Sequence, residues 1–129
     1  GLYMICSLSK NEAENKGFDD ALMLDYRGYI AEATGANIFF VKNGELFTPK
    51  PDCFLNGITR QTVINLANKL QLNVIEDHFQ IDFLSTCSEA FLTGTAVEIT
   101  PISSIDNYKF NDRTITRKLI NEFNKEVLG

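Results

Sequence analysis

The sequence predicts an α+β fold, a mixed α/β layer in which short strands and helices share one core. Apolar runs of strand length, such as residues 37–42, alternate irregularly with longer segments of helical periodicity. The repeated β-α-β alternation that would indicate a parallel Rossmann sheet is not found. With 129 residues, of which 44% are hydrophobic, the chain has the size of one domain and can bury one core.

The first half of the chain is expected to begin with the latter part of a helix and to continue as an antiparallel meander. Residues 2–16 carry apolar side chains near helical spacing, and Gly17 supplies a stop. Strand candidates follow at 21–24, 29–32, 37–42 and 45–48. Asn43-Gly44 is the strongest hairpin signal, because both residues accept the positive φ angles of a tight turn.

The second half is expected to contain two helices separated by short strands. The first helix, capped by Thr59 or a neighbour, has an apolar face formed by Val63, Ile64, Leu66, Ala67 and Leu70. Strands are expected at 73–77 and 89–93, a helical turn at 81–85, and a strand or loop at 97–102. The last helix, at 113–127, directs inward Ile115, Leu119, Ile120, Phe123 and Val127.

The composition argues against nucleic-acid and membrane partners. The chain carries 12 basic and 17 acidic residues, with a net charge of -5, and the charges are interspersed. A nucleic-acid footprint needs a basic patch or stripe, which this pattern does not provide. No apolar run approaches the roughly 18 residues needed to span a bilayer. The expected location is cytoplasmic.

The cysteines and the histidine do not suggest a metal site. Cys6, Cys53 and Cys87 have no C-x-x-C spacing, which indicates reduced thiols rather than a disulfide framework or a zinc site. His78 has no second His or Cys beside it, and we expect it to be solvated or locally hydrogen-bonded. The chain begins at Gly1 within an apolar stretch, which we interpret as a cut from a longer enzyme.

Three segments are candidates for binding an anion or a ring. Residues 55–60 form the end of a loop and the beginning of a helix. The N-terminus of a helix stabilises a bound anion by about 0.3–1 kcal/mol. The alternative is that Thr59 only caps the helix. Residues 93–96 place a glycine between two threonines at the end of a strand, which forms either an anion nest or a plain turn. Glu32 lies among small residues, either facing solvent or held opposite a ring nitrogen.

Four stretches of the chain, in their order and spacing, resemble the class IV aminotransferases, and the branched-chain aminotransferases most closely. They are DYRGYIAEATGANIFFV at 25–41, LFTP at 46–49, CFLNGITR at 53–60 and FLTGTAVEITPI at 91–102. The resemblance covers essentially the whole chain. It implies that residues 1–129 are the C-terminal cofactor-binding domain of the fold-type IV enzymes, an antiparallel-rich sheet or pseudo-barrel flanked by helices.

The resemblance also implies pyridoxal 5'-phosphate as the cofactor. The family's Schiff-base lysine is expected just before Gly1, so this chain would hold no catalytic residue, and the N-terminal domain would be absent from it. The residues that match cofactor contacts are Tyr3, Glu32, Gly35, Leu55, Ile58, Thr59 and Thr95, and those that match substrate contacts are Thr95 and Ala96.

The resemblance implies a role for each of these residues. Tyr3 would bind the phenolic oxygen of the ring, and Glu32 would pair with the pyridine nitrogen. The phosphate would be bound by Ile58, Thr59 and Thr95. The faces of the ring would be covered by Gly35 and Leu55, and the substrate carboxylate would be received by Thr95 and Ala96.

The implied activity is transfer of the amino group of leucine, isoleucine or valine to 2-oxoglutarate, as in branched-chain amino-acid biosynthesis. The implied assembly is a homodimer or a larger homo-oligomer, and this chain alone is expected to be inactive. Two alternatives stay open. The chain resembles other class IV enzymes, a D-amino-acid transaminase or an aminodeoxychorismate lyase, or it is a non-catalytic isolated fragment.

Overall fold

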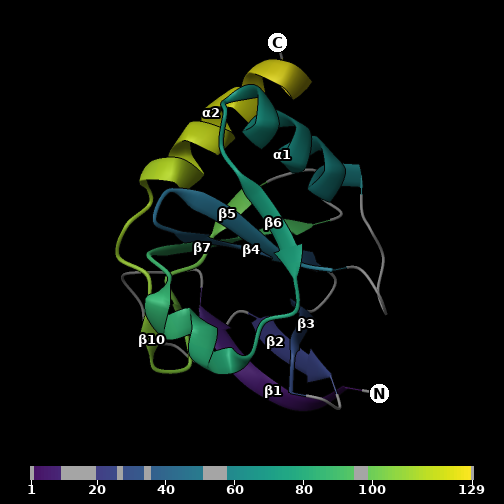
Figure 1. The fold of residues 1–129 in the computed structure, drawn as a ribbon, viewed down its shortest axis with the longest axis vertical. Helices are drawn as coiled ribbons and strands as arrows, with labels where there is room; N and C mark the ends of the chain where they lie inside the picture. Colours follow the sequence, from purple (N-terminus) through teal and green to yellow (C-terminus); the bar gives the residue numbers. More distant parts are fainter. Residues whose placement is uncertain are drawn as a thin grey trace.

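A computed structural model describes residues 2–9, 20–25, 28–33, 36–50, 58–94 and 99–128. The elements in the first half are β1 (Leu2–Ser9), β2 (Asp20–Asp25), β3 (Ile30–Ala33), β4 (Ala36–Lys42), β5 (Glu45–Pro49) and α1 (Ile58–Lys69). Those in the second half are β6 (Val74–Asp77), the 3-10 helix η1 (Ile81–Thr86), β7 (Glu89–Gly94), β8 (Ile99–Pro101), β9 (Ser104–Ile105), β10 (Tyr108–Lys109) and α2 (Thr114–Leu128). The two α-helices pack together over one side of the strands (Figure 1).

The beginning of the chain is a strand, so the helix expected at residues 2–16 is wrong where the structure describes it. β1 pairs antiparallel with β2 from Met4 opposite Leu24 to Leu8 opposite Asp20. Its other edge pairs with β9. The apolar spacing of this short stretch fits a helix and a strand about equally. Pairing on both edges of β1 then decides the conformation, because tertiary context overrides weak local preference.

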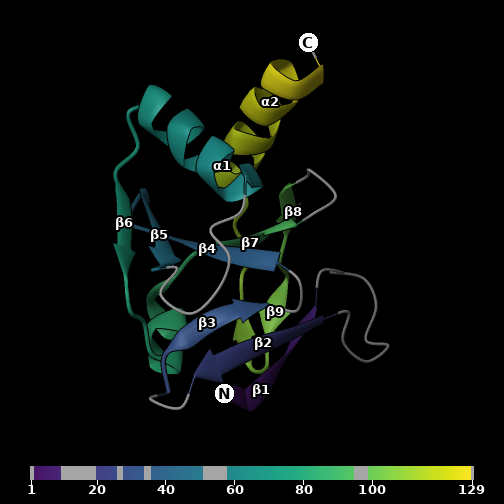
Figure 2. The same cartoon turned by 90° about the vertical axis from the view of Figure 1, so that its right-hand side faces the viewer.

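The strands curve into the ring that the expected pseudo-barrel requires, with β8 and β9 joined by the chain and not by a ladder. Antiparallel ladders lead from β1 through β2, β3, β4 and β7 to β8. Shortly after β8 the chain forms β9, which pairs with β1 and returns the ladder to its start. The β9–β10 hairpin, with Asp106 at φ 49° in its turn, has no counterpart among the expected elements. Figure 2 shows β1, β2 and β3 on the side of the molecule away from the helices.

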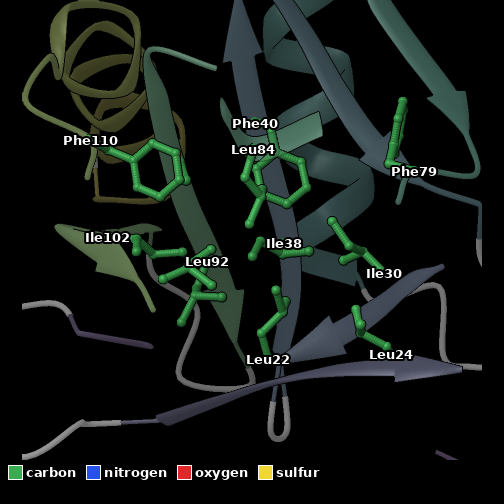
Figure 3. Close-up of a cluster of buried hydrophobic side chains, with 12 residues drawn as sticks. Leu22, Leu24, Ile30, Ile38, Phe40, Phe79, Leu84, Leu92, Ile102 and Phe110 are labelled. Carbon is green, nitrogen blue, oxygen red and sulfur yellow. The ribbon is translucent and has the colours of Figure 1, made fainter. Parts of the chain in front are cut away.

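Strand β4 separates two hydrophobic clusters, because successive side chains of a strand point to opposite faces. Ile38 and Phe40 join the cluster inside the ring, whose side chains converge in Figure 3. Phe39 and Val41 join the cluster beneath α1 and α2. Phe39 stacks on Phe91 of β7, with ring centroids 5.0 Å apart. Each fully buried phenylalanine contributes about 1.5–3 kcal/mol of hydrophobic stabilisation.

The hairpin and both helices agree with the sequence predictions. Asn43 and Gly44 have φ angles of 52° and 76°, as the tight turn requires. Of the residues predicted to face inward, five are buried: Val63, Leu66, Ala67, Leu119 and Phe123. Four others are half-buried: Ile64, Leu70, Ile115 and Ile120. The side chain of Val127 lies outside the described set. Within the described ranges, no helix has the length and apolarity to cross a bilayer.

Helix α1 connects two parallel strands, β5 and β6, and so forms a single β-α-β unit. Thr59 is the second residue of α1 rather than the residue before it, so it lies inside the first turn and does not occupy the cap position. The cap position, residue 57, lies outside the described residues.

Candidate functional site at one end of the sheet

One end of the sheet brings together the flanks of two predicted binding segments. Ala36, the first residue of β4, pairs with Ala33 of β3 and with Gly94 of β7. Residues 34–35 follow Ala33 and residues 95–98 follow Gly94 along the chain. The described residues that flank the two predicted segments therefore lie at the same end of the sheet, although they are far apart in the sequence.

The described part of the third predicted segment, residues 58–60, contacts the sheet at this end as well. β5 runs antiparallel to β4, so its last residue, Pro49, lies near the beginning of β4. Arg60, in the first turn of α1, donates a hydrogen bond from Nη2 to the Pro49 carbonyl oxygen at 3.2 Å. The N-terminus of α1 thus lies at the carboxyl ends of β5 and β6, where open sheets with β-α-β connections typically bind ligands.

The start of α1 has the electrostatic character of an anion site. The first N–H groups of an α-helix lack acceptors within the helix, and the helix dipole places partial positive charge there. The first turn of α1 contains no acidic residue that would repel an anion. Thr59 is buried, whereas Ile58 is exposed, with 87% of its surface accessible. The first turn therefore contains a buried threonine next to an exposed isoleucine.

A buried hydroxyl without a partner lies at the same end of the sheet. Thr93 precedes Gly94 in β7 and is 2% exposed, and its Oγ1 makes no hydrogen bond that the described structure records. Thr48 of β5 is also buried, but its Oγ1 donates to the Ile38 carbonyl oxygen at 2.8 Å. Leaving a buried hydroxyl unpaired costs about 1–3 kcal/mol. A hydrogen bond between the Thr93 hydroxyl and a polar group of a ligand would remove this cost.

The residues predicted from the sequence are described to different extents. Ile58 and Thr59 form the first turn of α1. Tyr3 lies in β1, and Glu32 lies in β3 opposite Met23, while their side chains are outside the described set. The remaining predicted residues, Gly35, Leu55, Thr95 and Ala96, also fall outside the described ranges.

Two buried charged residues were not singled out from the sequence. Arg60 is 0% exposed and Glu89 is 1% exposed. Arg60 belongs to the CFLNGITR stretch, and its burial could have been suspected from its position one turn before Val63 and Ile64. Glu89 shares a strand face with Phe91, two residues away, which was the available signal.

Other polar groups lie away from this end or serve local structure. The ring of His78 stacks on Tyr29 with centroids 5.2 Å apart, and its backbone N–H donates to Asp77 Oδ1 at 2.8 Å, in agreement with the expected local hydrogen bonding. Burial raises the pKa of Cys87 to about 11. Among the described side chains, no group of three His, Cys, Asp or Glu is arranged to hold a metal ion.

Comparison with known proteins identifies similar chains. Residues 1–105 match the family model described as amino-transferase class IV. The chain is 49% identical over 131 residues to a probable branched-chain-amino-acid aminotransferase of Rickettsia bellii, covering 98% of this chain and 45% of that protein. It is 43% identical over 109 residues to the branched-chain-amino-acid aminotransferase of Pseudomonas aeruginosa, covering 84% of this chain and 36% of that protein.

Solved structures show the same similarity. The branched-chain amino acid aminotransferase from Escherichia coli has a TM-score of 0.79 at 38% identity, over 83% of this chain and 38% of that one. A T.th. branched-chain amino acid aminotransferase, complexed with N-(5'-phosphopyridoxyl)-L-glutamate, has a TM-score of 0.78 at 37% identity, over 83% and 36% of the two chains. The present chain thus spans less than half the length of these relatives.

Proposed function

The chain belongs to the class IV aminotransferase family, and from this premise we propose that it is the cofactor-binding part of a branched-chain aminotransferase. The proposed enzyme transfers the amino group of leucine, isoleucine or valine to 2-oxoglutarate, which becomes glutamate. The substrate class is supported by the names of the relatives, which are branched-chain enzymes at 43–49% identity. The single observation that carries the proposal is that the described residues flanking the three predicted binding segments lie at one end of the sheet.

The described residues at this end fit the phosphate of pyridoxal 5'-phosphate. A helix N-terminus without acidic residues suits an anion, and the unpaired Thr93 hydroxyl offers a further donor nearby in the sheet. The backbone of Ile58 and the side chain and backbone of Thr59 would bind the phosphate. Thr95 would add another phosphate contact and, with Ala96, receive the substrate carboxylate.

The other predicted residues would hold the ring. When bound, pyridoxal phosphate supplies an electron-withdrawing ring that stabilises negative charge at the α-carbon of the amino acid. Glu32 would accept a hydrogen bond from the pyridine nitrogen and keep it protonated, and Tyr3 would donate to the phenolic oxygen. Gly35 and Leu55 would pack against the faces of the ring and keep it in place.

The test is an amino-transfer assay on the intact protein with pyridoxal phosphate. We expect glutamate to form from 2-oxoglutarate when L-leucine, L-isoleucine or L-valine is the donor. D-alanine and 4-amino-4-deoxychorismate serve as matched alternative substrates. Activity on D-alanine alone would indicate a D-amino-acid transaminase, and pyruvate release from aminodeoxychorismate would indicate the lyase. Either result, without activity on branched-chain donors, contradicts the proposal.

The assembly and the location complete the proposal. We propose a cytoplasmic enzyme that forms a homodimer or a larger homo-oligomer, as the family resemblance implies. The location is also supported by the sequence, whose three cysteines lack the paired spacing of a disulfide framework. Light scattering of the intact protein would measure the assembly directly, and a monomeric active enzyme would contradict it.

A further inference from the structure

The side chain of Arg60 is fully buried and joins α1 to two strands. It is 0% exposed and is the largest of the fully buried side chains among the described residues. Its Nη2 atom donates to the carbonyl oxygen of Pro49 at 3.2 Å and to Oε2 of Glu76 at 2.5 Å. Glu76 is only partly covered, with 43% of its side chain exposed. One guanidinium group therefore connects the first turn of α1 with the ends of β5 and β6.

The two acceptors lie side by side because β5 and β6 are parallel neighbours. Thr48 pairs with Glu76, and Pro49 pairs with Asp77 at the end of the ladder. The backbone N–H of Lys50 continues this pairing by donating to the Asp77 carbonyl oxygen at 3.1 Å. The strand ends thus form a fixed platform, and Arg60 attaches the beginning of the crossover helix to it.

Stability alone is a poor explanation for a charged group at this position. Taking a guanidinium out of water is costly, and well-packed apolar residues often replace buried ion pairs without loss of stability. An apolar side chain could cover the platform but could not bond to specific acceptors on both strands. The planar, multi-donor guanidinium can, and it fixes direction as well as distance.

We propose that Arg60 is a positioning residue for cofactor binding. By bonding to Pro49 and Glu76 it fixes residues 58–60 of α1, so that their backbone N–H groups face the phosphate of pyridoxal phosphate. Arg60 acts through the helix and does not itself touch the phosphate. This inference rests on the proposed function, and it deepens that function by assigning the geometry of the phosphate site to an ion pair between a buried arginine and a partly exposed glutamate.

The experiment compares two ligands that differ only in the phosphate. Dissociation constants for pyridoxal 5'-phosphate and for pyridoxal are measured by equilibrium dialysis on the intact protein. The variants are Arg60→Lys, Arg60→Met and Glu76→Gln. The matched controls are Lys125→Met and Glu122→Gln, which remove an exposed ion pair of α2 with an N–O distance of 3.4 Å. Thermal unfolding without ligand, followed by circular dichroism, checks that each variant is folded.

A positioning role predicts a loss specific to the phosphate ester. We expect Arg60→Met to weaken pyridoxal phosphate binding roughly tenfold, within the range of helix N-terminal contributions, and to leave pyridoxal binding unchanged. Arg60→Lys should recover part of this loss, because it restores a charge but not the two-acceptor geometry. Glu76→Gln should show a smaller loss of the same kind. The control variants should bind both ligands as the unmodified protein does.

Contrary outcomes separate this inference from the proposed function. Equal losses for both ligands, or no loss in any variant, overturn the positioning role while leaving the proposed function standing. If Arg60→Met does not fold, the binding constants of Glu76→Gln test the positioning role instead. This variant should fold, because Glu76 is partly exposed and glutamine keeps an acceptor oxygen. If the unmodified protein binds pyridoxal phosphate no more tightly than pyridoxal, the proposed function itself fails and the inference falls with it.

Discussion

Glu89, at the beginning of β7, accepts two hydrogen bonds from Thr116 in the first turn of α2. The Thr116 backbone N–H and its hydroxyl both reach Oε1 at 2.8 Å, and the Ile115 N–H reaches Oε2 at 3.1 Å. A buried carboxylate on a strand therefore supplies the acceptors that the N-terminus of this helix lacks within its own length. The negative charge is also favourable beside the positive end of the helix dipole.

Glu89→Gln should destabilise the protein, because the NH₂ group of the glutamine would face N–H donors at a position where a carboxylate oxygen accepts their hydrogen bonds. We expect a loss of about 1–3 kcal/mol in the free energy of unfolding, measured by urea denaturation. Glu122→Gln, on the more exposed side of α2, is the control and should change stability by less than about 0.5 kcal/mol. Equal effects of the two substitutions would show that the buried carboxylate does not support α2.

Replacing a buried threonine by valine should have opposite effects in two strands. Thr93→Val removes an unpaired hydroxyl, so the protein without cofactor should keep or gain stability, by up to about 1 kcal/mol. Thr48→Val breaks the bond to the Ile38 carbonyl oxygen and should cost about 1–2 kcal/mol. Urea denaturation of both variants checks this difference in sign.

The same pair of variants tests the cofactor site. If the Thr93 hydroxyl binds the phosphate, Thr93→Val should retain pyridoxal phosphate less well during dialysis, while Thr93→Ser should retain it. Thr48→Val should leave retention unchanged once its lower stability is allowed for by working at low temperature. Full retention by Thr93→Val would remove Thr93 from the site.

Cys87 should be unreactive at neutral pH. Burial raises its pKa from 9.0 to about 11, and the Thr86 hydrogen bond and the Lys42 charge oppose this effect only in part. Because the thiolate is the nucleophile, alkylation by iodoacetamide should accelerate as the pH approaches 11 rather than 9. The measurement uses a variant whose other cysteines are serine, with the urea-unfolded protein as the control. A native rate profile that matches the unfolded one would contradict the prediction.

The raised pKa of Cys87 also fixes the sign of a stability change. Between pH 9 and 11 the folded protein keeps the proton that the unfolded chain releases, so the free energy of unfolding should fall as the pH rises through this window. Cys87→Ala should show a smaller decrease over the same range. Urea denaturation at several pH values in this window compares the two proteins.

Gly44→Ala should destabilise the β4–β5 hairpin through its backbone alone. Gly44 has φ 76°, and a Cβ built there meets no atom within 4 Å, so the cost is strain and not a clash. We expect a loss of about 1–2 kcal/mol in the free energy of unfolding, measured by urea denaturation. Asn43→Gly, at the adjacent turn position with φ 52°, is the control and should be nearly neutral. A neutral Gly44→Ala would show that the turn adjusts to the side chain.

Glu32→Gln should lower kcat strongly in the intact enzyme and leave its thermal unfolding unchanged. The proposed role requires a carboxylate to keep the pyridine nitrogen protonated, and an amide cannot supply that charge. Glu45→Gln is the control, because the Glu45 carboxylate bonds Asn73 at 3.1 Å on the hairpin side of the sheet. Near-normal turnover by Glu32→Gln would exclude Glu32 from this role.

Patterns contained within a few residues predicted much of the fold. The Asn43-Gly44 turn, the β4 strand and the inward face of α2 each carry their signal locally, and the structure confirms them. Residues 2–9 were assigned wrongly, because their spacing suits two conformations and the decision comes from β2 and β9. The β9–β10 hairpin was missed because two-residue strands are too short to show a period.

The site was predictable to the extent that motifs mark it. Ile58 and Thr59 were chosen for their likeness to a family motif, and the structure places them at the start of α1; their roles stay predictions. Arg60 and Glu89 were overlooked because their partners, Glu76 and Thr116, lie on other elements. A charged residue in a sequence carries no sign of an acceptor or donor that only the tertiary fold supplies.

The pairing of Leu8 with Ile105 joins two strands, β1 and β9, that are far apart in the sequence. Contacts of such long range require the closure of a long loop, and topologies that depend on them fold slowly. During synthesis, the outer edge of β1 stays open until residues 104–105 have left the ribosome. In that interval the unpaired backbone N–H and C=O groups of β1 can bind a strand of another chain. We therefore expect aggregation of this protein to begin at β1.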